Sequence, residues 1–581
     1  MVKRKSRNKS RREIDRLSLL RGLLIIFAGF ILFRLFNLQI IEHGVYAALA
    51  DDQHRIYERL VPIRGEVYAR DYNSEKLFPM ALNENTYLLY ANPKQITEPD
   101  EVVDQLEQIL DIDTEAVLSR LRKVDDIYEP VAHNLTTEYK EYISNLGLEG
   151  LHFQIEPDRY YPEKNIGSHI IGFLGNDGEN RIGQYGIEGY YKEELAGKYG
   201  ELNIERDAGG NWITVGTTSI EEAQDGDDVV LTIDRNIQYQ ACQRLNEAVL
   251  RHGADGGSLI IINPKTGAIM AMCGSPDFDP NNYNEVENIN LFLNPSTFYT
   301  YEPGSVFKPI TMSAAIDLGV VTPQTTFVDE GQEVIGRYTI KNYENKVYGQ
   351  QTMTQVLEES INTGAIFAAR QVGDVLFEQY VKAYGFGLQT NIELESENGG
   401  DISTLNLHRD LYTSTASFGQ GITVTPLQLV TAYGAIANGG TLMKPYIIDE
   451  IHKPNGAVIK TEPQSIRQVI QPSTARTISA MLVSVVQNGH GKRAGVPGYF
   501  VAGKTGTAQI PKESGAGYDE NRTIGSFAGF APATDPQFVM LAKIDVPRDV
   551  QAAESSAAPL FGEMAAWLVN YLNIPPSITV E

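Results

Sequence analysis

The chain of 581 residues begins with one long apolar stretch, after which short strand-like runs alternate with amphipathic helical ones. Residues 17–41 are apolar with few interruptions, and about 20 helical residues span a bilayer core. The preceding residues, 1–16, hold eight lysines and arginines. Because the positively charged side of a span stays inside, we predict a basic cytoplasmic tail over 1–16 and a single-pass transmembrane anchor over 17–41. The rest of the chain is then expected outside the cytoplasmic (inner) membrane.

Two other interpretations of this stretch are a buried helix of a soluble protein and a cleaved signal peptide. No later segment is comparably apolar, which disfavours a buried helix. The run Gly22–Phe33 suits a signal peptide and residues 48–50 resemble a cleavage site, but the gap between them is long and charged. We therefore predict an uncleaved anchor, in which Arg34 must reach the interface or meet a polar partner.

The region after the anchor mixes strand-like runs with helices. Glu101–Ile109 and Asp113–Leu121 have the periodicity of amphipathic helices. Asp225–Asp228 has the composition of a turn and precedes an apolar run. We therefore place a boundary there, between a mixed, β-rich domain over 42–225 and a second domain over 226–581.

The second domain has the pattern of an α/β (α+β) unit in which a sheet is flanked by helices. Pro264–Gly267 joins two apolar runs and predicts a hairpin. The pattern predicts strands near 258–263, 268–272, 499–502, 526–530 and 538–544, and helices near 305–318, 352–371, 425–437 and 558–572.

Charge and composition narrow the possible partners. The formal net charge is −25, and since the tail carries +6, the remainder carries −31. Such an acidic body is repelled by a phosphate backbone, which argues against nucleic acid as a partner. We expect Cys242 and Cys273 to be two buried thiols, although one disulfide stays open in an oxidising compartment. No zinc-ligand spacing, HExxH or phosphate loop occurs, so we expect no metal and no cofactor.

Candidate chemistry rests on a set of short motifs in the second domain: Ser305-Val306-Phe307-Lys308, Ser360-Ile361-Asn362 and Lys504-Thr505-Gly506-Thr507. Each is weak alone, because S-x-x-K, S-x-N and K-T-G also occur elsewhere, at 6–9, 396–398 and 265–267. The sequence around each motif must therefore distinguish a functional motif from a chance match.

The surroundings of Ser305 predict a helix start. Pro309 is tolerated only in the first turn of a helix, which places Ser305 and Lys308 on one face at its N-terminus. A serine needs a base to become a nucleophile, and lysine can be that base when burial or nearby positive charge keeps it neutral. The alternative is an N-capping serine followed by a solvated lysine.

The other two motifs also lie where elements meet. Ser360 and Asn362 end an amphipathic helix, where both can point into a cleft or simply form a polar capping turn. The motif at Lys504 directly follows the strand expected at 499–502, and alternation along an extended chain would place Lys504 and Gly506 opposite Thr505 and Thr507.

Ordered S-x-x-K, S-x-N and K-T-G motifs are typical of penicillin-binding proteins and serine β-lactamases. The sequences around them resemble the class B, monofunctional transpeptidases of that group; they are Tyr301–Ser305, Ser417–Ile422, Thr425–Gln428 and Ala502–Gln509. Further segments resemble the same class's non-catalytic pedestal: Ile63–Tyr68, Asp158–Pro162, Gly186–Gly189 and Leu231–Asp234. The resemblance implies a pedestal over 42–225 and, over 226–581, a penicillin-binding transpeptidase domain with an antiparallel sheet flanked by helices. One departure is Ala69-Arg70, where the family usually has Asp-Arg, so a role of that aspartate does not carry over to this chain.

The resemblance implies a serine D-Ala-D-Ala transpeptidase. Ser305 would attack the penultimate D-alanyl carbonyl of a stem peptide and release the terminal D-alanine. Lys308 would take the serine proton, Ser360 would relay a proton, and Asn362 would hold the substrate amide. Lys504 would supply positive potential.

The same resemblance implies how the substrate is held. Thr505 and Thr507 would bind its carboxylate, and Gly506 would allow close backbone approach. The backbone N–H groups of Ser305 and Thr507 would form the oxyanion hole, where one donor is generally worth about 2.7–4 kcal/mol. An amine of a neighbouring chain would then resolve the acyl-enzyme, and β-lactams would acylate the same serine as covalent inhibitors.

Other functions remain as alternatives. A β-lactamase needs neither anchor nor pedestal, a class A enzyme needs a glycosyltransferase domain, and a β-lactam sensor needs a cytoplasmic output domain. A membrane-anchored D,D-carboxypeptidase would transfer to water, and a non-catalytic scaffold of a wall-synthesis complex is expected to lose a motif residue. The resemblance favours the division branch, hence septal cell-wall synthesis. It also implies a SEDS-type glycosyltransferase and division-complex membrane proteins as partners, contacted through anchor and pedestal.

Overall fold

The computed structural model describes residues 16–41, 55–74, 76–124, 126–177, 180–205, 219–512 and 517–577. Contacts divide the chain into two compact units, Met1–Pro62 with Lys198–Gln224, and Ile63–Gly197 with Asp225–Glu581. The first unit contains α1 (Arg16–Phe36), a π-helix (Asn37–Ile41) and an antiparallel sheet of β1 (Arg55–Leu60), β8 (Gly200–Glu205) and β9 (Ser219–Glu221). In this described part of the chain no helix reaches the length and hydrophobicity of a membrane span. Tail residues 1–15 and the cleavage-like sequence at 48–50 lie outside the described residues.

The second unit opens with a mixed sheet in the order β19-β18-β10-β2-β3-β4, to which β5 is added through β3. Strand β10 begins just after the predicted boundary turn and pairs in parallel with β2 and antiparallel with β18, so segments far apart in the sequence share this sheet. Arg70 ends β2 and pairs with Asp449 of β18 at 2.7 Å. The strands are β2 (Val67–Arg70), β3 (Leu77–Ala91), β4 (Glu129–Leu135), β5 (Leu151–Tyr160), β10 (Asp228–Asp234), β18 (Ile448–His452) and β19 (Val458–Lys460).

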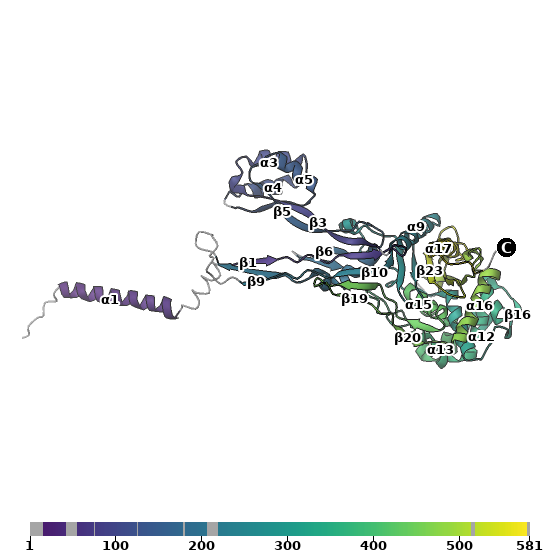
Figure 1. Cartoon of the computed structure of the whole chain (residues 1–581). Coiled ribbons are helices and arrows are strands. Elements are labelled where there is room, and N and C mark those ends of the chain that lie inside the picture. The colour runs from purple at the N-terminus through teal and green to yellow at the C-terminus, as the bar shows by residue number, and fades with distance from the viewer. Residues whose placement is uncertain are drawn as a thin grey trace, which may run out of the picture. The chain divides into compact units, whose positions relative to one another are not determined.

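The far halves of β3, β4 and β5 carry a small helical layer (Figure 1). Its helices are α3 (Pro99–Glu107), α4 (Thr114–Leu121) and α5 (Thr137–Asn145). The first two confirm the amphipathic helices predicted from the sequence. Asp113 caps α4 by accepting a hydrogen bond from the Ala116 N–H, and Val103, Leu106 and Leu121 point into a core shared with the strands.

The central antiparallel sheet runs in the order β12-β11-β23-β22-β21. Its strands are β11 (Gly256–Ile262), β12 (Ile269–Ser275), β21 (Ala502–Pro511), β22 (Tyr518–Ala531) and β23 (Phe538–Asp545). The predicted hairpin is the β11–β12 connection. The strand predicted at 499–502 is wrong: β21 starts at Ala502 and contains the Lys504 motif, because that segment forms the backbone ladder with β22 despite its polar side chains.

Alternation along these strands buries both faces of the sheet. One face packs against α9 (Arg235–Arg251) and α17 (Ala557–Tyr571) through Leu259, Ile261, Phe527, Met540 and Ala542. The other packs against α15 (Pro426–Ala437) and α16 (Pro472–Asn488) through Ile260, Ile262, Ala528, Val539 and Leu541. Figure 1 shows these helices on either side of β23. A sheet flanked by helices is therefore confirmed.

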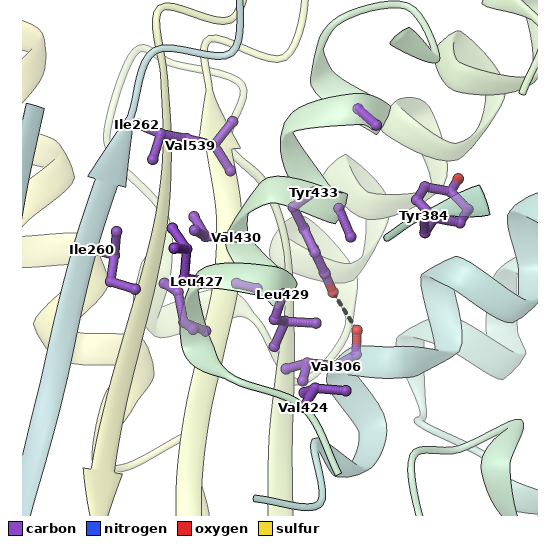
Figure 2. Close-up of a cluster of buried hydrophobic side chains, with 14 of the residues drawn as sticks. Ile260, Ile262, Val306, Tyr384, Val424, Leu427, Leu429, Val430, Tyr433 and Val539 are labelled. Atoms are coloured by element: carbon purple, nitrogen blue, oxygen red, sulfur yellow. Dashed lines mark hydrogen bonds between the residues drawn. The ribbon is translucent and has the colours of Figure 1, made fainter. Parts of the chain in front are cut away.

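Helix α15 is almost wholly buried within this unit. Eleven of its twelve residues are buried, and fully burying one Leu or Val stabilises a fold by about 1.5–3 kcal/mol. In Figure 2, Tyr433 of α15 points to the turn that carries Val306, and its hydroxyl donates to the Val306 carbonyl at 2.7 Å. The buried helix thus fixes the backbone next to Ser305.

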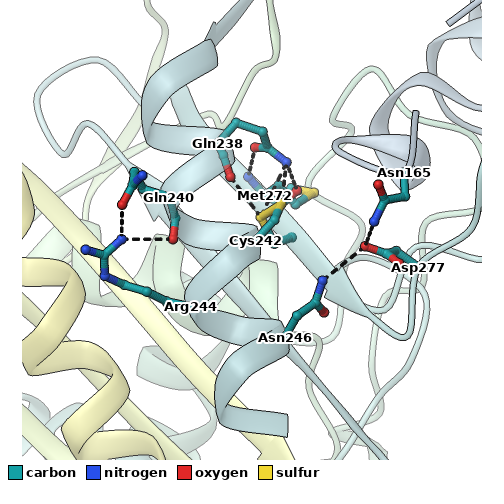
Figure 3. Close-up of a disulfide and its surroundings, with 9 residues drawn as sticks. Asn165, Gln238, Gln240, Cys242, Arg244, Asn246, Met272 and Asp277 are labelled. Atoms are coloured by element: carbon teal, nitrogen blue, oxygen red, sulfur yellow. Dashed lines mark hydrogen bonds between the residues drawn. A yellow bond between two sulfur atoms is a disulfide. The ribbon is translucent and has the colours of Figure 1, made fainter. Parts of the chain in front are cut away.

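The cysteine prediction is corrected. Cys242 of α9 and Cys273 of β12 form a disulfide, with their Cα atoms 5.2 Å apart (Figure 3). The sequence spacing does not show this, because the two cysteines meet only when α9 packs across β12. Gln238 fixes the same crossing, since its side chain exchanges two 2.8 Å hydrogen bonds with the backbone of Met272.

The remaining elements surround the central sheet. The helices are α6 (Ser168–Ile171), α7 (Gly186–Tyr190), α8 (Lys192–Ala196), α10 (Lys308–Asp317), α11 (Met353–Glu358), α12 (Asn362–Val372), α13 (Asp374–Ala383) and α14 (Asp410–Ala416). The small antiparallel pairs are β6 (Phe173–Asp177) with β7 (Asn180–Gln184), β13 (Thr326–Asp329) with β16 (Gly349–Thr352), β14 (Gln332–Ile335) with β15 (Tyr338–Lys341), and β17 (Thr441–Met443) with β20 (Ser465–Gln468).

Candidate active site

The Ser305 turn confirms the helix start predicted from Pro309. Residues Gly304–Phe307 form a 3₁₀ turn, and α10 follows directly with Pro309 in its first turn. Gly304 has a φ of +63° and lies against the backbone of Thr507 on β21. A glycine is required here, because a side chain would be strained at this φ. The turn is therefore packed directly against the strand that carries the third motif.

Lys308 is buried, with 1% of its surface exposed. Its Nζ donates to the Ser360 hydroxyl at 3.1 Å and to the Ser360 carbonyl. Burial lowers the pKa of Lys308 well below its usual range, and the nearby positive charge of Lys504 lowers it further. The lysine beside the candidate nucleophile is thus suited to be a neutral base.

Ser360 occupies a break between two helices. The helix expected over 352–371 divides into α11 and α12, and Ser360 has a φ of +56°. A non-glycine residue in this left-handed region costs of order 1–3 kcal/mol, which the surrounding packing must offset. The break directs the Ser360 hydroxyl to two lysines instead of continuing the helix.

Lys504 reaches the same hydroxyl from the sheet. It is fully buried, and its Nζ donates to Ser360 Oγ at 3.1 Å and to the Thr505 carbonyl at 3.1 Å. Burial lowers the pKa of Lys504 to about 7, against the opposing charge of Glu554. Its Nζ also lies 3.4 Å from Thr505 Oγ1, so the simple opposition of Lys504 and Thr505 predicted from strand alternation is incomplete. The long side chain of Lys504 bends towards Ser360 and stays buried.

A cavity of about 840 Å³ joins these elements, and its walls include Ser305, Ser360, Asn362, Thr505 and Thr507. Asn362 donates from Nδ2 to the Lys341 carbonyl at 3.0 Å, and Thr507 Oγ1 accepts from the Ala553 N–H at 3.1 Å. Gly506 does not line the cavity: a Cβ there would lie 2.8 Å from Val306 and 3.0 Å from the Pro303 carbonyl. The absence of a side chain at Gly506 lets β21 approach the Ser305 turn.

The look-alike motifs lie elsewhere. Lys265-Thr266-Gly267 is in the β11–β12 turn and Ser396-Glu397-Asn398 is in a loop, and neither lines the cavity. The tail motif at 6–9 lies outside the described residues. Within the described part of the chain, no cluster of His, Cys, Asp or Glu could hold a metal ion.

Further titratable side chains line the cavity, and the sequence patterns did not indicate them. Glu359, His490, Tyr518 and Glu554 come from four separate segments. Tyr518 donates to Glu302 at 2.9 Å, and burial raises the pKa of that carboxyl. None of these residues belongs to a recurring motif, so only their convergence in the fold could have revealed them.

Comparison with known proteins agrees with this geometry. Residues 257–566 match the family model of the penicillin binding protein transpeptidase domain, and residues 59–231 match the penicillin-binding protein dimerisation domain. Stage V sporulation protein D of Bacillus subtilis is 33% identical over 96% of this chain and 86% of its own length. Peptidoglycan D,D-transpeptidase FtsI of Escherichia coli K12 is 29% identical over 97% of this chain and 92% of its own length. The crystal structure of penicillin binding protein 3 from Mycobacterium tuberculosis, complexed with aztreonam, aligns with a TM-score of 0.70 at 26% identity, covering 90% of this chain and 98% of that one.

Proposed function

This chain belongs to the class B penicillin-binding proteins of the division type, and we propose that it cross-links peptidoglycan stem peptides as a serine D,D-transpeptidase in septal wall synthesis. One observation carries the proposal. Buried Lys308 and Lys504 each place Nζ 3.1 Å from the hydroxyl of Ser360, which lines the same cavity as Ser305. Three motifs distant in the sequence thus form one polar cluster.

Lys308 and Lys504 have different roles in acylation. Lys308, neutral because of burial and the charge of Lys504, takes the proton of Ser305 as the oxygen attacks the penultimate D-alanyl carbonyl. Ser360, bonded to both lysines, passes a proton to the leaving amine of D-alanine. Lys504 supplies positive potential towards the substrate carboxylate. The result is an acyl-enzyme on Ser305.

Substrate positioning falls to the other motif residues. Thr505 and Thr507 line the cavity and bind the terminal carboxylate, and Asn362 holds the substrate amide. The backbone N–H groups of Ser305 and Thr507 stabilise the oxyanion, and Gly506 keeps these two segments close. The amine of a second stem peptide then resolves the acyl-enzyme and completes the cross-link. Water in that role would make the protein a D,D-carboxypeptidase.

The first test is intact-mass spectrometry of the chain after incubation with benzylpenicillin, followed by peptide mapping. A stable added mass is expected on the peptide that contains Ser305, because the acyl-enzyme cannot release its leaving group. Ser396, the serine of the look-alike S-x-N motif, is the internal control and is expected to stay unmodified. A folded protein that gains no mass, or gains it elsewhere, would make the non-catalytic scaffold the better reading.

The pH dependence of acylation follows from the two lysines. The rate constant kcat/KM for a β-lactam reports the free enzyme. It is expected to rise with pH as Lys308, whose pKa is lowered, loses its proton, and to fall above about pH 7 as Lys504 becomes neutral. In Lys504→Arg the guanidinium stays charged, so the falling limb is expected to disappear. A falling limb unchanged in that variant would contradict the role of Lys504.

We also propose the domain order and membrane attachment inferred from the sequence. These are the tail over 1–16, the anchor over 17–41, the pedestal over 42–225 and the transpeptidase domain over 226–581. The two family matches, 59–231 and 257–566, support the last two. The apolar composition of 17–41 and its basic flank support a single span with the catalytic domain outside.

The partners proposed within the membrane are a SEDS-type glycosyltransferase and other division-complex proteins. Arg34 lies within the apolar stretch, where a charge is costly unless it meets a polar group. Arg34→Leu is therefore expected to weaken co-purification with such a glycosyltransferase, and Arg21→Leu, nearer the basic flank, is the matched control. If the two variants co-purify with equal amounts of the glycosyltransferase, Arg34 does not contribute to the contact.

A further inference from the structure

A histidine and two carboxylates border the Ser360 side of the cavity. His490 follows α16, and its Nδ1 lies 2.9 Å from an oxygen of Glu554. Its Nε2 lies 3.9 Å from Glu359, the residue next to Ser360. All three side chains are partly exposed and line the same cavity as Ser305. The acylation steps described above use none of them.

The backbone holds this group in place. The His490 N–H donates to the Glu358 carbonyl at 3.3 Å, and Gly489 lies so close to Glu358 that a Cβ would be 2.5 Å from its carbonyl oxygen. On the other side, the Ala553 N–H donates to Thr507 Oγ1, which fixes the loop carrying Glu554 to β21. Histidine and carboxylate are therefore attached to the two segments that form the site.

The transfer step, in which an acceptor amine attacks the acyl-enzyme, requires a group that removes a proton from that amine. An alkyl amine is mostly an ammonium ion at neutral pH and must lose a proton before its nitrogen can attack. Lys308 and Ser360 already handle the proton that moves between Ser305 and the leaving or attacking amine. A separate proton acceptor on the acceptor side is required, and histidine is the side chain most often used for this purpose.

We propose that His490, oriented by Glu554, is a catalytic residue of the transfer step that takes the proton from the ammonium of the acceptor stem peptide. This inference rests on the proposed function. Glu359 and Glu554 attract the cation, and His490 accepts one proton, leaving a neutral amine. The nitrogen then bonds to the acyl carbon as the bond from that carbon to Ser305 Oγ breaks. The nitrogen's second proton returns to Ser305 through Ser360, and His490 releases its proton to solvent.

The charges around His490 are consistent with this role. The carboxylates of Glu359, directly after α11, and Glu554, in the loop before α17, lie beside it, whereas Glu358 contacts it through its backbone carbonyl. The cavity walls also include Lys341 and Lys346, and Lys346 pairs with Glu344 at 2.9 Å. The two carboxylates beside His490 favour an incoming ammonium ion over a neutral or anionic group at that point of the wall. Transfer to water has no ammonium to deprotonate, so His490 would separate cross-linking from hydrolysis.

The test measures how the acyl-enzyme of the full chain is partitioned between an amine and water. An acyl-D-alanyl thioester serves as donor and D-alanine as acceptor, and mass spectrometry counts the two products. In His490→Gln, the ratio of transfer to hydrolysis is expected to fall about 10²-fold at pH 7, the lower range for a general base. The difference in this ratio between His490→Gln and the wild type is expected to become smaller at a pH where the acceptor amine is mostly neutral. A merely structural role of His490 would not produce this pH dependence.

His452→Gln is the matched control, because His452 also pairs with a glutamate, Glu450, at 2.8 Å but does not line the cavity. Its partition ratio is expected to equal that of the wild type. A ratio unchanged in His490→Gln at pH 7, while benzylpenicillin still acylates Ser305, would overturn this inference alone. Absence of acylation in the wild type would overturn the proposed function instead.

Discussion

Lys308→Met is expected to slow acylation by benzylpenicillin by about 10²–10⁴-fold, the usual contribution of a positioned general base. Methionine is nearly as long as lysine and apolar, so it suits a position with 1% exposure, but it cannot take the proton of Ser305. Ser360 keeps its hydrogen bond from Lys504, so the cluster loses one partner without collapsing. The loss is therefore expected in rate and not in folding.

The measurement is the second-order rate constant of acylation, with the thermal unfolding midpoint recorded for each variant. Lys265→Met is the matched control, since Lys265 belongs to the look-alike K-T-G and pairs with Asp535 on the surface. It is expected to acylate at the wild-type rate. An acylation rate in Lys308→Met within a few-fold of this control would show that another group takes the serine proton.

Glu188→Gln is expected to destabilise the second unit by about 3–5 kcal/mol, the cost of breaking a buried ion pair from one side. Glu188 is fully buried, and its two oxygens accept from Arg159 at 2.7 Å and from Arg64 at 2.9 Å. Burial alone would raise the pKa of Glu188, but the two guanidinium groups outweigh it and lower the pKa. Removing the carboxylate leaves two cations with no counter-charge between them.

A lower thermal midpoint and faster amide exchange in β2 and β5 are the readouts, since Arg64 precedes β2 and Arg159 lies in β5. Because the folded pKa of Glu188 is lowered, its contribution is present above the unfolded pKa and is lost as pH falls through the folded value. The gap between wild type and variant is thus expected to shrink in acid. Glu563→Gln, which breaks an exposed pair with Arg251, is expected to cost at most about 1 kcal/mol. Equal midpoints for the two variants would refute the argument.

The sequence by itself determined the local features of this protein. Apolar runs near 258–263, 526–530 and 538–544 predicted the strands β11, β22 and β23, and Pro309 located the helix start beside Ser305. These predictions succeed because side-chain spacing and proline geometry act within a few residues. The motif residues could also be found, since the family resemblance attaches each of them to a position.

Only the tertiary structure decided what these elements meet. An apolar pattern predicts that a face is buried, but it does not identify the segment that packs against that face. The sequence therefore did not reveal that Cys242 and Cys273 form a disulfide. It also could not show that Arg64, Arg159 and Glu188, from three separate pedestal motifs, neutralise one another. The left-handed break at Ser360, the pKa values of Lys308 and Lys504, and the pairing of His490 with Glu554 depend on burial and on groups distant in the chain. Long-range packing sets these properties because desolvation and Coulomb interactions depend on distance in space, not on separation in sequence.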